Sequence, residues 1–186
     1  MQVEMKVNDK SVQAEISEEQ LKKMGIFEPL KELGLVEDKP KTGYERGEEC
    51  NDEYYYLVDV DSEVKRIKKT HSTLDRDCYD TGNYYSNQTI AKSNARADML
   101  FRRLRQWQAQ NDKPISEKDW NDESKKKWFV AYSYGAEKLY ADYYYIMRLP
   151  NTIHFATKEK AEEAIEVFRD ELIWYFVEYQ QRLDEE

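Results

Sequence analysis

Glycine and histidine are scarce in this chain, and their scarcity narrows the chemistry that it can carry. Of the 186 residues, 6 are glycine and 2 are histidine. The sequence has no Walker loop, no GxGxxG and no GxSxG, so neither a backbone phosphate cradle nor a nucleophile elbow is expected. His71 and His154 have no second histidine or cysteine at metal-ligand spacing. We therefore expect structural or surface roles for both histidines, and neither a cofactor nor a metal.

Cysteines and long apolar runs are also few. Cys50 and Cys78 lack CxxC spacing; a disulfide between them is possible, but free thiols are expected in a chain of this kind. The apolar runs fall far short of the roughly 20 residues that cross a bilayer. The start, Met1–Lys6, alternates like a strand and lacks the apolar core of a signal peptide. These features favour a soluble, cytoplasmic protein and exclude a membrane partner.

Charged and aromatic residues are plentiful. Charged residues make up 36% of the chain, aromatic residues 13%, and the net charge is −9. Such a composition is typical of a folded protein with a heavily charged surface. Both ends of the chain are acidic and its middle is mildly basic. The acidic stretches are either ordinary solvated faces or a surface that docks on a basic partner.

One aromatic pattern occurs twice. Tyr54–Asp59 leads to Gly82–Asn87 and then to a helical run, and Trp128–Tyr132 leads to Ile153–Thr157 and a second helical run. The repetition predicts a duplicated unit in which a small sheet is closed by a helix. In each copy a short third strand is expected, at Asn83–Tyr85 and at Thr152–Phe155.

We therefore predict an α+β fold. An N-terminal β-hairpin–helix unit (1–36) and an acidic linker (37–53) precede a first sheet–helix module (54–110), a connector (111–127) and a second sheet–helix module (128–186). Ser17 with Gln20 forms a capping box for a first helix. Residues 70–81 are predicted to form a loop. The first long helix, capped by Ser86 or Asn87, should bury its C-terminal half best, and the second should run unbroken from Thr157.

Two acidic groups are candidate contact residues. Asp59, Asp61 and Glu63 should share one face of a strand by alternation, and the linker adds a second cluster: Glu48, Glu49, Asp52 and Glu53. Either group could be plainly solvated. Asp59, Asp61 and Glu63 could also imitate spaced phosphates and compete with nucleic acid for a basic groove. Trp120, among polar residues, is either an anchor over a sheet edge or an exposed contact.

The basic runs favour a different partner, an acidic one such as nucleic acid. Lys65–Lys69, Arg102–Arg105 and Lys125–Lys127 accompany many tyrosines, which could stack single-stranded nucleic acid or enclose a nucleotide. The negative net charge and the lack of an RNP-like motif make direct nucleic-acid binding the less expected alternative.

Several segments carry a family resemblance. They are Ile16–Lys23, Thr42–Arg46, Tyr54–Tyr56, Gly82–Ser86 and His154–Glu162. Together they resemble small proteins encoded by bacteriophages and prophages of Clostridia-type gut bacteria. The shared motifs are structural, so no functional residue is transferred. In its first copy, Asn87–Ile90 departs from the acidic pattern that follows the strand in that family.

The resemblance implies a setting in which small acidic proteins inhibit host defence, as anti-CRISPR proteins do. Our first hypothesis is a non-enzymatic inhibitor that blocks a host defence protein, such as a Cas nuclease, by contacting its basic groove. The second is a protein that sequesters a cyclic nucleotide defence signal between tyrosines and basic side chains. An enzyme is the least favoured class, since no convergent acid, base and nucleophile are visible in the sequence.

Overall fold

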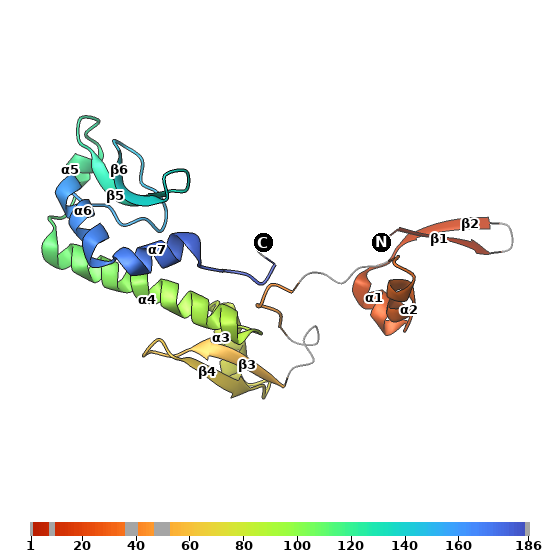
Figure 1. Cartoon of the computed structure of the whole chain (residues 1–186). Helices are drawn as coiled ribbons and strands as arrows, with labels where there is room; N and C mark the ends of the chain where they lie inside the picture. Colours follow the sequence, from red (N-terminus) through yellow and green to blue (C-terminus); the bar gives the residue numbers. More distant parts are fainter. Residues whose placement is uncertain (1, 8–9, 36–40, 47–52, 185–186) are drawn as a thin grey trace. The chain divides into compact units, whose positions relative to one another are not determined.

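The structure is a computed structural model that describes residues 2–7, 10–35, 41–46 and 53–184. The chain divides into two compact units, Met1–Pro40 and Lys41–Glu186. Both mix helices and antiparallel strands, so the fold is α+β (Figure 1). The described residues form three two-stranded sheets and seven helices.

The first unit is a hairpin followed by two short helices. Strands β1 (Gln2–Val7) and β2 (Lys10–Glu15) pair antiparallel. Helix α1 (Glu18–Lys23) begins at the predicted capping box, in which Ser17 and Gln20 bond reciprocally. Helix α2 (Phe27–Glu32) follows, and Leu21 and Phe27 bury almost their whole surface. The hairpin and the cap are local signals, and both predictions are confirmed.

The first sheet of the second unit pairs β3 (Tyr54–Val58) with β4 (Val64–Lys68). The predicted third strand is reduced to one bridge, Tyr56 to Tyr85. Beside this bridge, the Asn83 side chain makes the two hydrogen bonds that a neighbouring strand would make with Val58. Its Oδ1 accepts from the Val58 N–H over 2.7 Å, and its Nδ2 donates to the Val58 carbonyl over 2.8 Å.

The predicted loop at 70–81 is wrong, because most of it is helix α3 (Thr73–Asp80). Ser72 and Asp75 form a capping box at its start. Only Asp75 and Cys78 of this helix are buried. An aspartate on the buried face weakens the apolar periodicity by which a helix is predicted. Cys78 is a free thiol, and Cys50 lies outside the described residues.

Helix α4 (Gln88–Asn111) begins at Asn87, whose side chain accepts from the N–H groups of Thr89 and Ile90. The prediction that its C-terminal half is best buried is wrong. Ile90 and Ala91 are fully buried with side chains of β3 and β4, and Leu100 and Leu104 belong to a second core with α6. One helix therefore supplies two cores, so small residues near its start are as deeply buried as leucines near its end.

The second sheet pairs β5 (Lys127–Ser133) with β6 (Lys138–Tyr144), after a helical turn α5 (Glu117–Trp120). Again a single bridge, Trp128 to Phe155, stands where a third strand was predicted. The chain then enters α6 (Lys158–Val167), capped by Thr157 as predicted.

The last helix is broken, contrary to prediction. Helix α6 ends and α7 (Arg169–Val177) begins at Phe168, whose φ of −114° and ψ of 19° leave the helical region. This places the buried Phe168 ring edge-on to Trp107 at 6.4 Å. Beyond α7 the chain returns to the start of the unit, where the N–H of Leu183 donates to the Thr42 carbonyl over 3.0 Å. Within the described ranges, no helix combines the length and apolarity that a membrane crossing requires.

Candidate anion-binding pocket

The connection from β4 to α3 is held in an unusual conformation. His71 has a φ of 54°, in the left-handed region that non-glycine residues seldom adopt. Asp75 fixes this turn: its Oδ2 accepts from the N–H of Thr70 at 2.7 Å and of Ser72 at 3.3 Å, and its Oδ1 accepts from the Tyr55 hydroxyl at 3.2 Å. The strained turn is thus maintained by a carboxylate anchored to a fully buried tyrosine.

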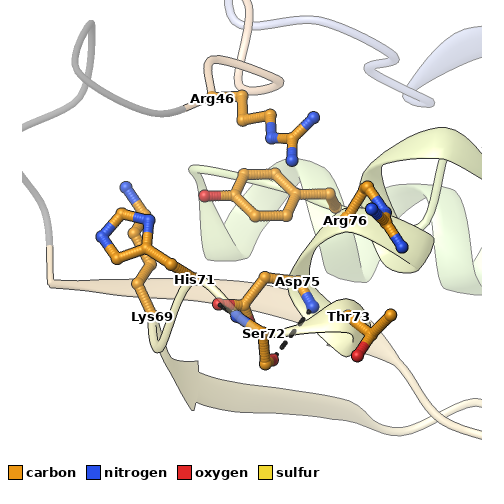
Figure 2. Close-up of a pocket in the computed structure, with 8 residues that line it drawn as sticks. Arg46, Lys69, His71, Ser72, Thr73, Asp75 and Arg76 are labelled. Carbon is orange, nitrogen blue, oxygen red and sulfur yellow. Dashed lines mark hydrogen bonds between the residues drawn. The ribbon is translucent and has the colours of Figure 1, made fainter.

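A hollow of about 360 Å³ opens at this connection (Figure 2). In that view Lys69 and His71 lie on one side and Arg76 on the other, with Arg46 above. Arg46 and the segment 69–76, which are distant in sequence, therefore converge on one space. The lining residues are Arg46, Lys69, His71, Ser72, Thr73, Asp75, Arg76 and Tyr84.

An aromatic cluster supports the pocket. Tyr84 is buried and stacks on Tyr55, with ring centroids 4.4 Å apart and planes 11° apart. Tyr79 meets Tyr84 edge-on, and the Arg46 guanidinium lies over the Tyr79 ring at 4.4 Å. Stacking on an aromatic face orients a guanidinium while leaving its N–H donors available at the edge.

The charge of the pocket is positive. Arg46, Lys69 and Arg76 are basic residues, and Asp75 is the one acid in the lining. Burial opposes ionisation of Asp75, but the backbone N–H groups of Thr70 and Ser72 outweigh burial, so the pKa of this carboxyl lies below its usual range. Its negative charge is therefore engaged by donors of the turn itself. The lining holds no second carboxylate, and the nearest acid to Arg76 outside it is Asp77, whose exposed carboxylate lies 3.9 Å from the Arg76 guanidinium.

The predicted acidic residues lie elsewhere. Glu48, Glu49 and Asp52 fall outside the described residues, and Glu53 is exposed just before β3. The prediction that Asp59, Asp61 and Glu63 share a strand face is wrong, because they form the turn between β3 and β4. The turn engages them locally: Asp59 Oδ1 accepts from the Val60 N–H, and Asp61 Oδ1 from the Glu63 N–H.

Lys65 neutralises part of this acidic turn. Its ammonium lies 3.0 Å from Glu63 and 3.8 Å from Asp61. Both carboxylates nevertheless remain more than half exposed at the hairpin tip. A surface lysine between two acids reduces the potential that would attract a basic partner.

Trp120 is half-buried and belongs to a cluster around β5. Its ring meets the His154 ring edge-on at 5.1 Å, and the Arg148 guanidinium lies over it at 5.2 Å. This is an anchoring position of the kind that the sequence offered as one alternative. His154 is buried as a structural histidine would be, whereas His71 is exposed in the pocket.

The sequence did not predict that the lining residues form one pocket. The run Lys65–Lys69 was visible as basic, but nothing local connects Lys69 with Arg46 or Arg76. Among the residues that the structure describes, no three His, Cys, Asp or Glu side chains are grouped as a metal site would need. Comparison of the chain with protein-family models, curated proteins and solved structures gave no match.

Proposed function

We propose that this protein is a non-enzymatic binding protein for a small phosphate-bearing ligand of the nucleotide class, held in the pocket between β4 and α3. The observation that carries the proposal is the convergence of Arg46, Lys69 and Arg76 on a cavity whose one acid is already engaged. Arginine and lysine are the usual partners of phosphate oxygens, and their bonds to it are charge-assisted.

The size and lining of the pocket fit this class. About 360 Å³ lies at the lower end of the range for small-molecule sites, so a phosphate with part of a nucleoside can enter. The hydroxyls of Ser72 and Thr73 add short hydrogen-bonding groups, and the buried Tyr84 forms part of the wall. In the setting that the phage resemblance implies, sequestration of a cyclic nucleotide defence signal is the role that such a site would serve.

Calorimetric titration tests the proposal directly. Inorganic phosphate, mononucleotides and cyclic dinucleotides would be titrated in parallel at low and high salt. We expect binding of at least one phosphate ligand, weakened by salt because the contacts are ionic. Lys69→Gln and Arg76→Gln should each weaken it about tenfold. Lys68→Gln is the matched control, since Lys68 is an exposed neighbour on β4 outside the lining.

The outcomes separate a built site from general attraction. An equal loss of affinity in Lys68→Gln and Lys69→Gln would mean that the ligand is attracted only by the overall charge of the protein. Undetectable binding of every phosphate compound by a folded wild-type protein would refute the proposal. Conversion of a bound nucleotide to product would refute its non-enzymatic part.

A second candidate function is inhibition of a host defence protein through the acidic turn, and the exposure of Asp61 and Glu63 at a hairpin tip favours it. Asp61→Asn with Glu63→Gln removes two charges while retaining an oxygen acceptor at each position. The test is retention of a defence nuclease, identified by mass spectrometry, on the immobilised protein. We expect the Asp61→Asn, Glu63→Gln variant to retain no nuclease. The control variant, Glu117→Gln with Glu123→Gln, should retain the nuclease like wild type, because these exposed acids are more than 50 residues away in the sequence from the acidic turn. Equal retention by both variants would exclude the turn.

A further inference from the structure

The two sheets of the second unit are built alike around their single bridges. Tyr56 bridges to Tyr85 in the first sheet, and Trp128 bridges to Phe155 in the second. The residues just before Tyr56 and Trp128 are Tyr55 and Lys127, and both are almost completely buried. We therefore treat positions at equal offsets from the two bridges as equivalent.

Each of these buried residues holds the connection that leaves the second strand of its sheet. The Tyr55 hydroxyl donates to Asp75, in the connection from β4 to Tyr85. The Lys127 ammonium donates to the carbonyl of Tyr145, in the connection from β6 to Phe155, and also to the Asp122 and Lys125 carbonyls. A tyrosine hydroxyl in the first sheet and a lysine ammonium in the second thus hold the connection at equivalent positions.

The far ends of the two connections also correspond. Tyr84 precedes the bridging Tyr85 and lines the first pocket, and His154 precedes the bridging Phe155. Both rings are buried between aromatic neighbours, which for His154 are Trp120 and Phe129. The Nε2 atom of His154 is buried without a hydrogen-bond partner among the described residues. A polar atom without a partner marks this end of the connection as incomplete.

A second hollow, of about 440 Å³, lies on the connection that follows β6. Arg105 of α4, Arg148 and the segment 149–153 line it, with no acid in that lining. Asn151, with a φ of 53°, repeats the left-handed conformation of His71. Trp120 packs under the Arg148 guanidinium as Tyr79 packs under that of Arg46. The second connection therefore repeats the cations, the strained turn and the aromatic support of the first.

We infer that the connection from β6 to Phe155 forms a second anion-binding site, in which Arg105 and Arg148 bind a phosphate group. The lining contains two guanidinium groups and no carboxylate. Each guanidinium offers paired N–H donors, from which phosphate oxygens accept hydrogen bonds. The site is separate from the first pocket, since the two share no lining residue. It therefore stands or falls independently of the function proposed above.

Nuclear magnetic resonance of the whole chain, titrated with inorganic phosphate, tests this inference residue by residue. We expect backbone amide shifts in 148–154 and a shift of His154 Nε2, with an affinity distinct from that of residues 69–76. Arg105→Gln with Arg148→Gln should weaken the shifts in 148–154 at least tenfold and leave those at 69–76 unchanged. Lys69→Gln with Arg76→Gln should have the reverse effect. Lys113→Gln, which removes one positive charge at an exposed lysine just beyond α4, is the control for general charge.

Three results would overturn the inference. Phosphate shifts confined to 69–76 would leave the second hollow empty. Shifts in 148–154 that survive the double arginine variant would assign them to other groups. A loss of equal size in Lys113→Gln would reduce the effect to general charge. If shifts appear in 148–154 alone, the second site holds while the proposed function of the first pocket fails.

Discussion

The hydroxyl of Tyr55 donates to Oδ1 of Asp75 over 3.2 Å, joining strand β3 to the first turn of α3. The same carboxylate caps the helix and closes the turn through Thr70 and Ser72. The shape of the pocket therefore depends on a contact made beneath it, by a residue that does not line it.

Tyr55→Phe tests this dependence. Phenylalanine retains the ring that stacks on Tyr84 and removes only the hydroxyl. We expect a loss of about 1–1.5 kcal/mol in the free energy of unfolding, because one hydrogen bond of a buried group is lost. The pKa of Asp75 should rise toward its ordinary value, since Tyr55 is one of the donors that lower it. Urea denaturation and a carboxyl-carbon titration measure the two effects. Tyr140→Phe, at an exposed position, should change neither.

Glu45 should support the second unit at neutral pH and not in strong acid. Its carboxylate accepts from the N–H and hydroxyl of Thr42 and from the Ser86 hydroxyl. Burial opposes ionisation, but these bonds outweigh it and lower the pKa of Glu45 to about 2 from an ordinary value of 4.5. A lowered folded pKa gives stability that is complete above about pH 4.5 and is lost as the pH falls toward 2.

Glu45→Gln should therefore cost about 1–3 kcal/mol at pH 6, because two oxygen acceptors become one. The difference from wild type should shrink steadily below pH 4.5. Urea denaturation across this range is the measurement. Glu53→Gln, at an exposed position nearby in sequence, should unfold like wild type at every pH. A Glu45→Gln deficit that is the same at pH 6 and pH 2.5 would contradict the assignment.

Lys127 should be essential to the second sheet. It is 1% exposed, and its ammonium donates to the carbonyls of Asp122, Lys125 and Tyr145. Lys127→Met keeps the length of the side chain but leaves three carbonyls without their donor, so we expect a loss of about 2–4 kcal/mol. Thermal unfolding measures the effect. Lys138→Met, an exposed lysine on β6 of the same sheet, should unfold within about 1 °C of wild type.

Features that depend on neighbouring residues were predictable from the sequence. The hairpin of β1 and β2, the box of Ser17 and Gln20, and the caps at Asn87 and Thr157 all lie where expected. Each is decided within a few residues, because caps and strand pairs act over short sequence distances.

Features that depend on tertiary packing were not. Helix α3 buries an aspartate, Asp75, because the Tyr55 hydroxyl donates a hydrogen bond to it. The sequence of this helix therefore lacks the apolar periodicity by which a helix is predicted. The break at Phe168 has neither glycine nor proline to announce it and follows from packing against Trp107. The pocket joins Arg46 to residues 69–76, and no pattern in the sequence connects these two segments, because only tertiary packing brings them together.

The stability of the second sheet should fall as the solution becomes mildly acidic, because of His154. Burial disfavours the charged imidazole and the Arg148 guanidinium repels it, so the pKa of His154 lies below its ordinary value of 6.5 although the Thr152 backbone opposes the shift. The unfolded chain then binds the proton more readily than the folded one, and stability is complete above about pH 6.5 and declines below it. His154→Phe should flatten the unfolding free energy between pH 7 and pH 5, whereas His71→Gln, which removes the other histidine, should keep the wild-type slope. A slope that persists in His154→Phe and vanishes in His71→Gln would move the titrating group to the first pocket.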